Sequence, residues 1–460
     1  MEKEFSKIVG EGQSHILRFW DKLSDAEREA LRAQVASLDT NALARMRKVL
    51  KGKGKAAAPS SPMEPAPAIE LTDPTERAAA IARGEDELRS GRVAVVLVAG
   101  GQGSRLGFDG PKGAFPIGPI TGAPLFHFHA RKILAISRRY ETTVPFYVMT
   151  SEVNDAATRK CFEEHGYFGL DKADVFFFRQ GVWPAMDKSG KIILDAPGHI
   201  FMSPDGHGGI LSALSSSGAI ADMQRRSIST VFYFQVDNPL VDIADPAFIG
   251  LHLLLKSDIS IKVCAKRDPQ EGLGMMVVRD GHYEMVEYTE LTEEQKNMRT
   301  DSGDLYYKYG SVAIHVFDFA FLKRETSAEL PLHIAHKKIP TCDDDGNVVK
   351  PTEPNGFKFE KFVFDVIPDA GRAIDVVFDR AEEFSPVKNA EGNDSPATCR
   401  RDMQRKWMSW FEQCGVNIPR DGAGDPAVKI EIDPATAIDA ASLRTFLAAT
   451  PVDTNRDICI

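Results

Sequence analysis

Cysteine is scarce in this sequence and forms no pattern. The 460 residues include six cysteines, which lie far apart and contain no CxxC pair. This spacing argues against zinc ribbons and disulfide frameworks, because both need several cysteines at regular short spacings. Scattered cysteines fit a reducing compartment best, so we expect the chain in the cytoplasm.

Long apolar runs and an excess of positive charge are also missing. No stretch approaches the roughly 18 apolar residues that a membrane span requires, and the acidic start MEKEFSKIVG lacks the apolar core of a signal peptide. The 66 acidic residues outnumber the 56 lysines and arginines, which gives a net charge of −10. No global positive field would attract nucleic acid, so we expect neither nucleic acid nor a membrane as a partner. The oligomeric state is left open.

The length and the local composition predict several structural parts. Apolar residues at helical spacing, with a capping-box pattern at Ser24 and Glu27, predict an N-terminal helical lobe over residues 1–50. Prolines, glycines and lysines predict a linker over 51–75. The main domain is expected at 76–409, followed by a small C-terminal unit at 410–460.

From Arg92 onward, short β-branched or aromatic runs alternate with helical patterns. The expected strands lie at 93–99, 144–150, 174–178, 230–236, 258–265, 275–278 and 311–317. The expected helices lie at 124–140, 154–165, 208–224 and 357–367. Strands joined by helical crossovers predict an α/β fold with a mostly parallel sheet.

The segment LVAGGQGSRLGFDGPKG, residues 97–113, directly follows the first of these strands. Its glycines would let backbone N–H groups face an anion, so we expect a phosphate there. The P-loop pattern GxxxxGK[ST] fails, because Lys112 precedes Gly113. The dinucleotide pattern also fails, because the spacing is GxGxxxG and residues 110–140 contain no acidic residue for a ribose. A nucleotidyltransferase loop remains, with Arg105 and Lys112 neutralising a triphosphate; the alternative is a plain tight turn with solvated charges.

This loop resembles the signature of the nucleoside-diphosphate-sugar pyrophosphorylases, and the chain from about Phe19 to Asn389 resembles the eukaryotic-type UDP-N-acetylhexosamine pyrophosphorylases. The similar segments are RFWDKLS, FRQGVWPAM, SPDGHGG, VDNPLVDIADPAFIG, VEYTE, HKKIP, NGFKFEKFVFD and EFSPVKNA. The resemblance implies a Rossmann-like nucleotidyltransferase sheet within 76–409. It also implies transfer of a uridylyl group from UTP to a hexose 1-phosphate, foremost N-acetylglucosamine 1-phosphate.

The same resemblance implies roles for individual residues. Nucleotide binding falls to Ala99, Gly100, Gly101, Lys112, Gln180, Gly206, Asp237 and Lys358. Sugar binding falls to His207, Gly274, Glu287, Ser311 and Lys388. Catalysis falls to Arg105, Lys112 and Lys388. Gln180 would read the uracil edge, for which a side-chain amide offers both a donor and an acceptor.

Asp237 is the best candidate ligand for Mg²⁺. It ends the apolar strand TVFYFQV, and open α/β sheets bind ligands at the carboxyl ends of their parallel strands. One carboxylate together with substrate phosphates suits Mg²⁺, which keeps much of its water. The alternative is that Asp237, Asn238 and Pro239 simply form a turn.

A sugar phosphate is already ionised at neutral pH, so the expected reaction needs no general base and rests on alignment and charge neutralisation. Ser104, His207 and Ser311 depart from the family pattern, which has threonine, asparagine and asparagine there. Glucose or galactose 1-phosphate therefore stays open as the acceptor. Two rival functions are a non-catalytic nucleotide-sugar sensor and a glycosyltransferase using Asp343, Asp344 and Asp345 as a DxD motif, although DDDGN is typical of a turn.

Overall fold

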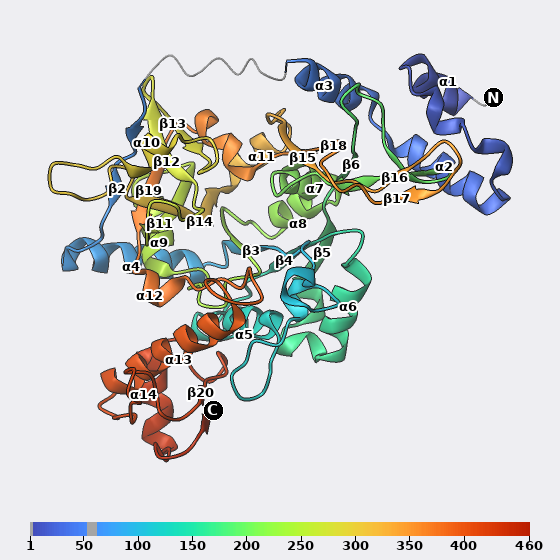
Figure 1. Cartoon of the computed structure of the whole chain (residues 1–460). Helices are drawn as coiled ribbons and strands as arrows, with labels where there is room; N and C mark the ends of the chain where they lie inside the picture. Colours follow the sequence, from blue (N-terminus) through green and yellow to red (C-terminus); the bar gives the residue numbers. More distant parts are fainter. Residues whose placement is uncertain (1–2, 53–61) are drawn as a thin grey trace. The chain divides into compact units, whose positions relative to one another are not determined.

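The computed structural model describes residues 3–52 and 62–460 (Figure 1). The chain forms two compact units, each built from three stretches of sequence. Unit 1 comprises Met1–Pro62, Gln180–Ser212 and Ala328–Asp365, and unit 2 comprises Met63–Arg179, Ala213–Ser327 and Val366–Ile460. The predicted linker includes residues 53–61, which lie outside the described residues. The domain boundaries at residues 75 and 409 stay predictions.

Unit 2 contains an eight-stranded sheet that is mostly parallel, as the sequence predicts. Its strands, in spatial order, are β2 (Ala68–Ile69), β19 (Ala373–Val377), β11 (Ile259–Ala265), β14 (Tyr309–Asp318), β10 (Thr230–Gln235), β3 (Val93–Val98), β4 (Phe146–Thr150) and β5 (Val175–Arg179). Only β14 is antiparallel to its two neighbours. The central strands are almost wholly buried, which explains their continuous apolar sequences.

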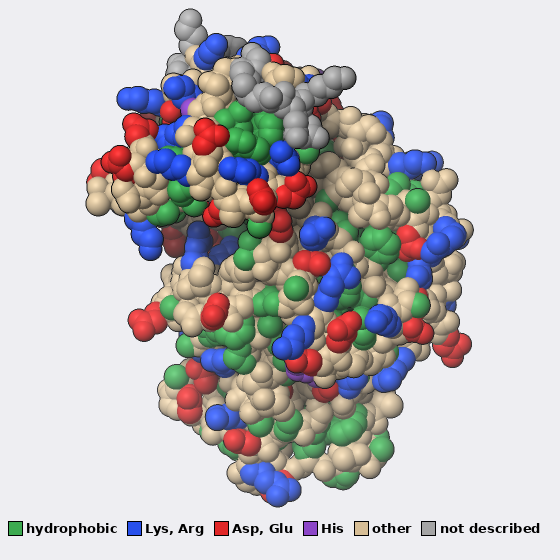
Figure 2. Space-filling view, turned by 90° about the vertical axis from the view of Figure 1, so that its right-hand side faces the viewer, with side chains coloured by type: hydrophobic (Ala, Val, Ile, Leu, Met, Phe, Trp, Pro, Cys, Tyr) green, Lys and Arg blue, Asp and Glu red, His purple; other side chains and the backbone are tan. Residues whose placement is uncertain are grey.

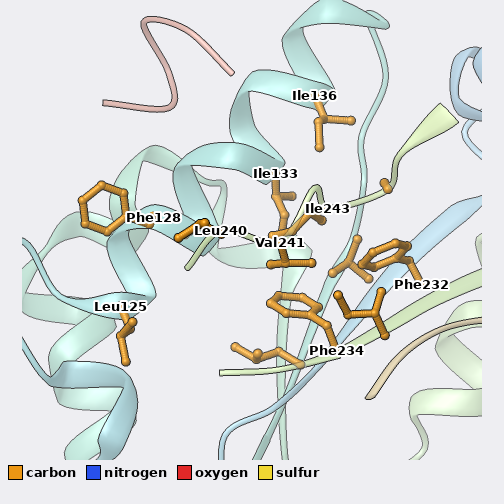
Figure 3. Close-up of a cluster of buried hydrophobic side chains, with 14 of the residues drawn as sticks. Leu125, Phe128, Ile133, Ile136, Phe232, Phe234, Leu240, Val241 and Ile243 are labelled. Atoms are coloured by element: carbon orange, nitrogen blue, oxygen red, sulfur yellow. The ribbon is translucent and has the colours of Figure 1, made fainter. Parts of the chain in front are cut away.

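Helices connect and cover these strands. They include α4 (Pro74–Arg89), α5 (Leu125–Arg139), α6 (Asp155–Glu164), α8 (Ala219–Arg225), α9 (Pro246–Leu254) and α11 (Phe319–Glu325). Helix α5 turns its apolar face toward Phe232 and Phe234 of β10 (Figure 3). Helices α4 and α9 approach closely at two glycines: a Cβ on Gly250 would lie 1.7 Å from the Ala80 carbonyl oxygen, and one on Gly84 would lie 1.9 Å from that of Pro246. Any side chain at these positions would force the two helices apart.

Smaller elements of unit 2 lie outside the main sheet. A three-stranded sheet has the order β1 (Glu64–Pro65), β12 (Met275–Arg279) and β13 (His282–Val286), and the short helices are α10 (Glu293–Asn297) and α12 (Arg380–Glu383). The C-terminal elements are α13 (Pro396–Gln413), β20 (Ile430–Glu431), α14 (Ala440–Ala449) and β21 (Ile458–Cys459). Helix α13 lies beside α5 (Figure 1), where Trp407 packs against Phe128. The C-terminal elements therefore share the apolar core of unit 2.

Unit 1 combines helices with short strands. Its helices include α1 (Lys3–Gly10), α2 (Asp25–Ser37) and α3 (Thr40–Lys51), and the predicted capping box at Ser24 and Glu27 is confirmed. The paired strands are β6 (Val182–Pro184) with β9 (Met202–Pro204), β7 (Leu194–Ala196) with β8 (His199–Ile200), β15 (His333–Lys337) with β18 (Gly356–Glu360), and β16 (Thr341–Cys342) with β17 (Val348–Val349). One apolar cluster takes residues from all three stretches, among them Leu31, Ile200 and Phe359. Helix α7 (Gly209–Ser216) contains the boundary between the two units.

The helix predicted over 357–367 is wrong. Strand β18 occupies the first part, and a 3-10 helix, Val363–Asp369, follows it. The segment GFKFE alternates apolar and polar residues, a period of two that places Phe357 and Phe359 in the core of unit 1. Antiparallel pairing with β15 satisfies the backbone of this strand.

The surface and the cysteines agree with an ordinary globular protein. The face drawn in Figure 2 carries lysine and arginine interspersed with aspartate and glutamate, with no broad area of one sign. None of the helices in the described part of the chain is long and apolar enough to cross a bilayer. All six cysteines lie in that part, and none forms a disulfide.

A buried carboxylate on α4 gives unit 2 a predictable response to acid. Burial by itself would raise the pKa of Glu87, but hydrogen bonds from Arg92, Ser229 and Arg83 lower that pKa to about 2 from an ordinary 4.5. Since the folded pKa is the lower one, Glu87 stabilises the fold above about pH 4.5, and this stabilisation disappears as the pH falls toward 2. We expect Glu87→Gln to lower the free energy of unfolding at pH 7 by about 3 kcal/mol. Urea unfolding at pH 7 and at pH 3 tests this: the difference between variant and wild type should shrink at pH 3, and an unchanged difference would contradict it.

Candidate functional site

The glycine-rich loop after β3 folds back on itself. The Gly103 N–H donates to the Gly110 carbonyl oxygen at 2.9 Å, and the Lys112 N–H donates to the Gly101 carbonyl oxygen at 3.0 Å. Gly107 adopts φ +69°, a left-handed conformation that favours glycine. These contacts return the chain to the end of β3, so Lys112 lies beside the carboxyl end of that strand although it is 14 positions further along the chain than Val98.

Asn154 supports the loop, a role that no sequence motif indicates. It lies fully buried just before α6, and its Nδ2 donates to the carbonyl oxygens of Ala99 at 2.8 Å and Gly101 at 3.2 Å. Its Oδ1 accepts from the Ser151 N–H at 2.8 Å. A single buried amide therefore fixes the loop to the carboxyl end of the neighbouring strand β4. A lone asparagine before a helix looks like an ordinary cap, so only its three-dimensional partners reveal the role.

Lys112 and Asp237 come together at the carboxyl ends of β3 and β10. The Nζ of Lys112 lies 3.6 Å from Oδ2 of Asp237, and the two side chains are 19% and 13% exposed. The strands are parallel neighbours, and this is why residues that follow them meet at one edge of the sheet. The pair is longer than a good hydrogen bond, which leaves the ammonium and the carboxylate with donor and acceptor capacity for another group.

Lys388 lies on a segment that is tied to the same edge. The N–H of Val387 donates to the carbonyl oxygen of Asp237 at 2.8 Å, and the N–H of Lys388 donates to that of Asp394 at 2.7 Å. Its ammonium lies 5.6 Å from the centroid of the Phe384 ring. Arg105 is exposed on the short 3-10 helix Ser104–Leu106. Parallel pairing of β3 with β10 and the hydrogen bond from Val387 to Asp237 therefore bring the glycine loop, Asp237 and the backbone next to Lys388 to one edge of the sheet in unit 2.

The donor set at this edge fits a magnesium ion held in part by substrate. Among the described residues, no cluster of three or more His, Cys, Asp or Glu side chains could hold a metal by itself. Asp237 offers one partly exposed carboxylate. A single carboxylate is a common protein contribution to Mg²⁺ when substrate phosphates supply the other oxygens.

Three residues predicted to contact the sugar also lie together in unit 2. The Ser311 N–H donates to the Gly274 carbonyl oxygen at 2.8 Å, across a bridge between the start of β14 and the residue before β12. A Cβ on Gly274 would lie 2.9 Å from Sδ of Met285 and 3.6 Å from Oε1 of Glu287. The Oγ of Ser311 accepts from the N–H of Ala313 at 3.3 Å. The serine hydroxyl is therefore engaged in its own turn, where a longer asparagine side chain would extend further.

The other predicted residues belong to unit 1. Gly206 has φ +84°, and a Cβ there would lie 2.4 Å from the Lys361 carbonyl oxygen, so only glycine fits. The ring of His207 stacks on Phe362 at 5.1 Å between centroids, and its Nδ1 accepts from the Val363 N–H at 3.1 Å. Burial lowers the pKa of His207 to about 4, so the imidazole is neutral at pH 7 and carries its proton on Nε2. The side chain offers a hydrogen-bond donor but no second acceptor.

A carboxylate beside Gly206 has an unusual environment. Asp205 is 3% exposed, its Oδ1 has no hydrogen-bond partner, and burial raises its pKa to about 6. Lys358, on β18, lies with Nζ 5.1 Å from the Phe201 ring centroid, and burial lowers the pKa of its ammonium. Gln180 is partly exposed and begins Gln180–Ser212, the second stretch of sequence in unit 1.

The acidic triplet is a turn, as its sequence indicates. Asp343, Asp344 and Asp345 lie between β16 and β17, where Oδ1 of Asp343 accepts from the N–H groups of Asp345 at 3.0 Å and Asn347 at 2.8 Å. Asp344 pairs with Arg18 at 2.8 Å. These carboxylates serve the hairpin, which weakens the glycosyltransferase alternative.

Known proteins share both the sequence and the fold. The profile of the UTP–glucose-1-phosphate uridylyltransferase family matches residues 45–394. UDP-N-acetylhexosamine pyrophosphorylase-like protein 1 of Homo sapiens is 38% identical, over 96% of this chain and 94% of its own length. UDP-N-acetylglucosamine pyrophosphorylase of Saccharomyces cerevisiae is 34% identical, over 90% of this chain and 92% of its own.

The crystal structure of the uridine diphosphate N-acetylglucosamine pyrophosphorylase from Trypanosoma brucei in complex with inhibitor has a TM-score of 0.84, with 27% identity, and covers 100% of this chain and 98% of its own. The sequence matches cover most of the chain, and the structural match covers all of it. The chain belongs to the UTP–glucose-1-phosphate uridylyltransferase family of nucleotidyltransferases.

Proposed function

We propose that this chain transfers the uridylyl group of UTP to N-acetylglucosamine 1-phosphate, releasing pyrophosphate and UDP-N-acetylglucosamine. The observation that carries the proposal is the pairing of Lys112 with Asp237 at 3.6 Å, beside a glycine-rich loop at the carboxyl edge of a parallel sheet. Relatives named as UDP-N-acetylglucosamine pyrophosphorylases support this substrate over glucose 1-phosphate.

The reaction joins two anions, so its main barrier is charge repulsion. A phosphate oxygen of the sugar phosphate attacks the α-phosphorus of UTP, and the bond from that phosphorus to the bridging oxygen of pyrophosphate breaks. The backbone N–H groups of the loop orient the triphosphate, and the fixed charges of Lys112, Arg105 and Lys388 offset the negative charge of the transition state. Asp237, together with the substrate phosphates, would hold Mg²⁺, and the ion would supply further charge neutralisation.

No general base is needed, because the attacking phosphate is ionised at neutral pH. The proposal therefore predicts in-line displacement with inversion at the α-phosphorus. A chiral α-thiophosphate analogue of UTP tests this step by the configuration of the product. Retention would contradict direct transfer and indicate a covalent intermediate.

We expect the choice of sugar 1-phosphate to depend on the residues predicted to contact the sugar. His207 offers one donor where asparagine would offer a donor and an acceptor, and Ser311 has no amide at all. Ser311 still carries a hydroxyl and His207 still carries an N–H, and relatives of this chain are named UDP-N-acetylglucosamine pyrophosphorylases, so we keep N-acetylglucosamine 1-phosphate as the preferred acceptor. Glucose and galactose 1-phosphate are the alternatives.

A pyrophosphate-release assay decides both the activity and the acceptor. Purified protein, UTP and Mg²⁺ are combined with each of the three sugar phosphates in turn. We expect kcat/KM to be highest for N-acetylglucosamine 1-phosphate, by about tenfold or more, because a lost polar contact in a closed site costs at least ~1.4 kcal/mol. A preference for glucose or galactose 1-phosphate would overturn the choice of sugar. No turnover, with UTP or UDP-sugar binding retained in calorimetry, would favour the sensor.

The compartment is a second part of the proposal. We infer that the protein works in the cytoplasm, which its six unpaired cysteines support. Its partners would be the small molecules UTP and sugar 1-phosphate.

A further inference from the structure

Two segments that carry proposed site residues are tied together in unit 2. Residues 237–242 form the Asp237 segment, and residues 382–388 form the Lys388 segment. Nδ2 of Asn238 donates to the Glu383 carbonyl oxygen at 2.6 Å, and its Oδ1 accepts from the Ser385 N–H at 3.1 Å. With the bond from the Val387 N–H to the Asp237 carbonyl oxygen, three contacts join the two segments. The distance between the two segments therefore determines how far apart Asp237 and Lys388 lie.

Lys406, on α13, binds both segments at once. Its Nζ donates to the Leu240 carbonyl oxygen at 3.3 Å, to Oδ1 of Asp242 at 2.9 Å and to the Glu382 carbonyl oxygen at 2.5 Å. Its side chain is only 6% exposed. All three N–H groups of the ammonium therefore have acceptors, two on the Asp237 segment and one on the Lys388 segment. Charge-assisted bonds that are shielded from water are strong and geometrically selective.

Lys132, on α5, binds two carbonyls of the Asp237 segment, those on either side of Leu240. Its Nζ donates to the carbonyl oxygens of Pro239 at 2.6 Å and Val241 at 2.7 Å. Figure 3 shows this part of the chain against α5, with Leu240 near Phe128, and with Val241 and Ile243 close to Ile133. The carbonyls of residues 239, 240 and 241 thus all accept from lysines.

The two lysines, Lys132 and Lys406, differ in the number of hydrogen bonds that they donate. Burial, with a contribution from nearby Lys406, lowers the pKa of Lys132 to about 7. A neutral amine keeps two N–H groups, enough for the two acceptors of Lys132. Lys406 has three acceptors, which match the three N–H groups of an ammonium. Of the pair, Lys406 alone reaches the Lys388 segment.

We propose that Lys406 is a positioning residue for uridylyl transfer: it locks the Asp237 segment to the Lys388 segment and so fixes the distance between the proposed metal ligand and the proposed cation. The inference rests on the proposed function. Lys406 lies beyond residue 394, where the family match ends. Helix α13 is then part of the machinery that aligns the reactants.

Lys406→Met tests the proposal in the full-length protein. We expect kcat for UDP-N-acetylglucosamine synthesis to fall about tenfold to a hundredfold, the cost of a small misplacement of reacting groups, while KM for UTP changes by less than about threefold. Thermal unfolding is measured alongside, because Asp242 and two carbonyls lose their donor. Glu87→Gln, which breaks a buried ionic cluster on α4, is the matched control: it should lower Tm and leave kcat unchanged.

The double variant Lys406→Met with Asp242→Asn separates positioning from stability. It removes the unpaired carboxylate, so Tm should recover in part. The carbonyls of Leu240 and Glu382 still lack their shared donor, so kcat should stay low. A normal kcat in Lys406→Met, or a kcat that rises in step with Tm in the double variant, would overturn the positioning role. Absence of turnover in the wild type would instead contradict the proposed function, which keeps the two failures distinct.

Discussion

Replacement of Lys112 by alanine is expected to lower kcat about a hundredfold or more, the scale found when one preorganised electrostatic donor is removed from an active site. The ammonium is held at the carboxyl edge of the sheet by a loop whose backbone returns to Gly101, and its side chain is 19% exposed. A fixed charge in such a place costs no reorganisation when negative charge develops. Steady-state synthesis of UDP-N-acetylglucosamine measures the effect.

The control for Lys112→Ala is Lys160→Ala. Lys160 is a lysine of unit 2 on α6, 74% exposed, with only a long pairing to Glu164 at 3.6 Å. This variant should keep its full rate. A Lys112→Ala enzyme within about threefold of the wild-type kcat would disprove the assigned role, since a catalytic cation is worth far more.

Asp237→Asn is expected to lower kcat by a comparable factor and, unlike Lys112→Ala, to change the dependence of the rate on Mg²⁺. The amide is isosteric and keeps the backbone bond to Val387, so the edge of the sheet should keep its shape. The negative charge is lost, and an amide oxygen is a weaker ligand for a hard cation than a carboxylate is. We expect kcat to fall about a hundredfold or more at a fixed Mg²⁺ concentration, the scale for removing a fixed charge from the site. The Mg²⁺ concentration for half-maximal rate should also rise.

Titration of Mg²⁺ against initial rate distinguishes these effects. Asp86→Asn is the control, because Asp86 is a 72% exposed carboxylate on α4. If the Mg²⁺ dependence of Asp237→Asn matches that of the wild type, Asp237 is not a metal ligand, whatever its effect on kcat. A rate loss with unchanged Mg²⁺ dependence would reassign it to holding Lys112.

The sequence predicts the parallel sheet well because buried parallel strands produce continuous apolar runs, as in β3 and β10. It does not reveal that β14 runs antiparallel, since strand direction depends on partners far along the chain. The helix predicted at 357–367 is wrong because a two-residue alternation in GFKFE competes with a helical pattern over the same residues. The composition of unit 1 from three separate stretches has no local signature.

The sequence predicts the parts of the candidate site that belong to a motif. It does not reveal the parts that depend on a single supporting side chain. The glycine loop and Asp237 each follow an apolar strand, a position that points to ligand binding. Asn154 and Lys406 instead bind backbone carbonyls that are distant in sequence. Nothing in their local sequence separates them from a cap or a surface lysine. The roles assigned to individual site residues stay predictions for the variants above.

The three-stretch construction of unit 1 has a consequence during synthesis. Its apolar cluster joins Leu31 to Ile200 and Phe359, so the N-terminal helices have no complete core until the third stretch has left the ribosome. The third stretch ends at residue 365 and the first at residue 62, a gap of 303 residues. Translation at about 5–20 residues per second makes this wait about 15 to 60 s. During that time the apolar side chains of α2 and α3 lack the partners from the later stretches that bury them, and exposed apolar surface of this kind favours aggregation.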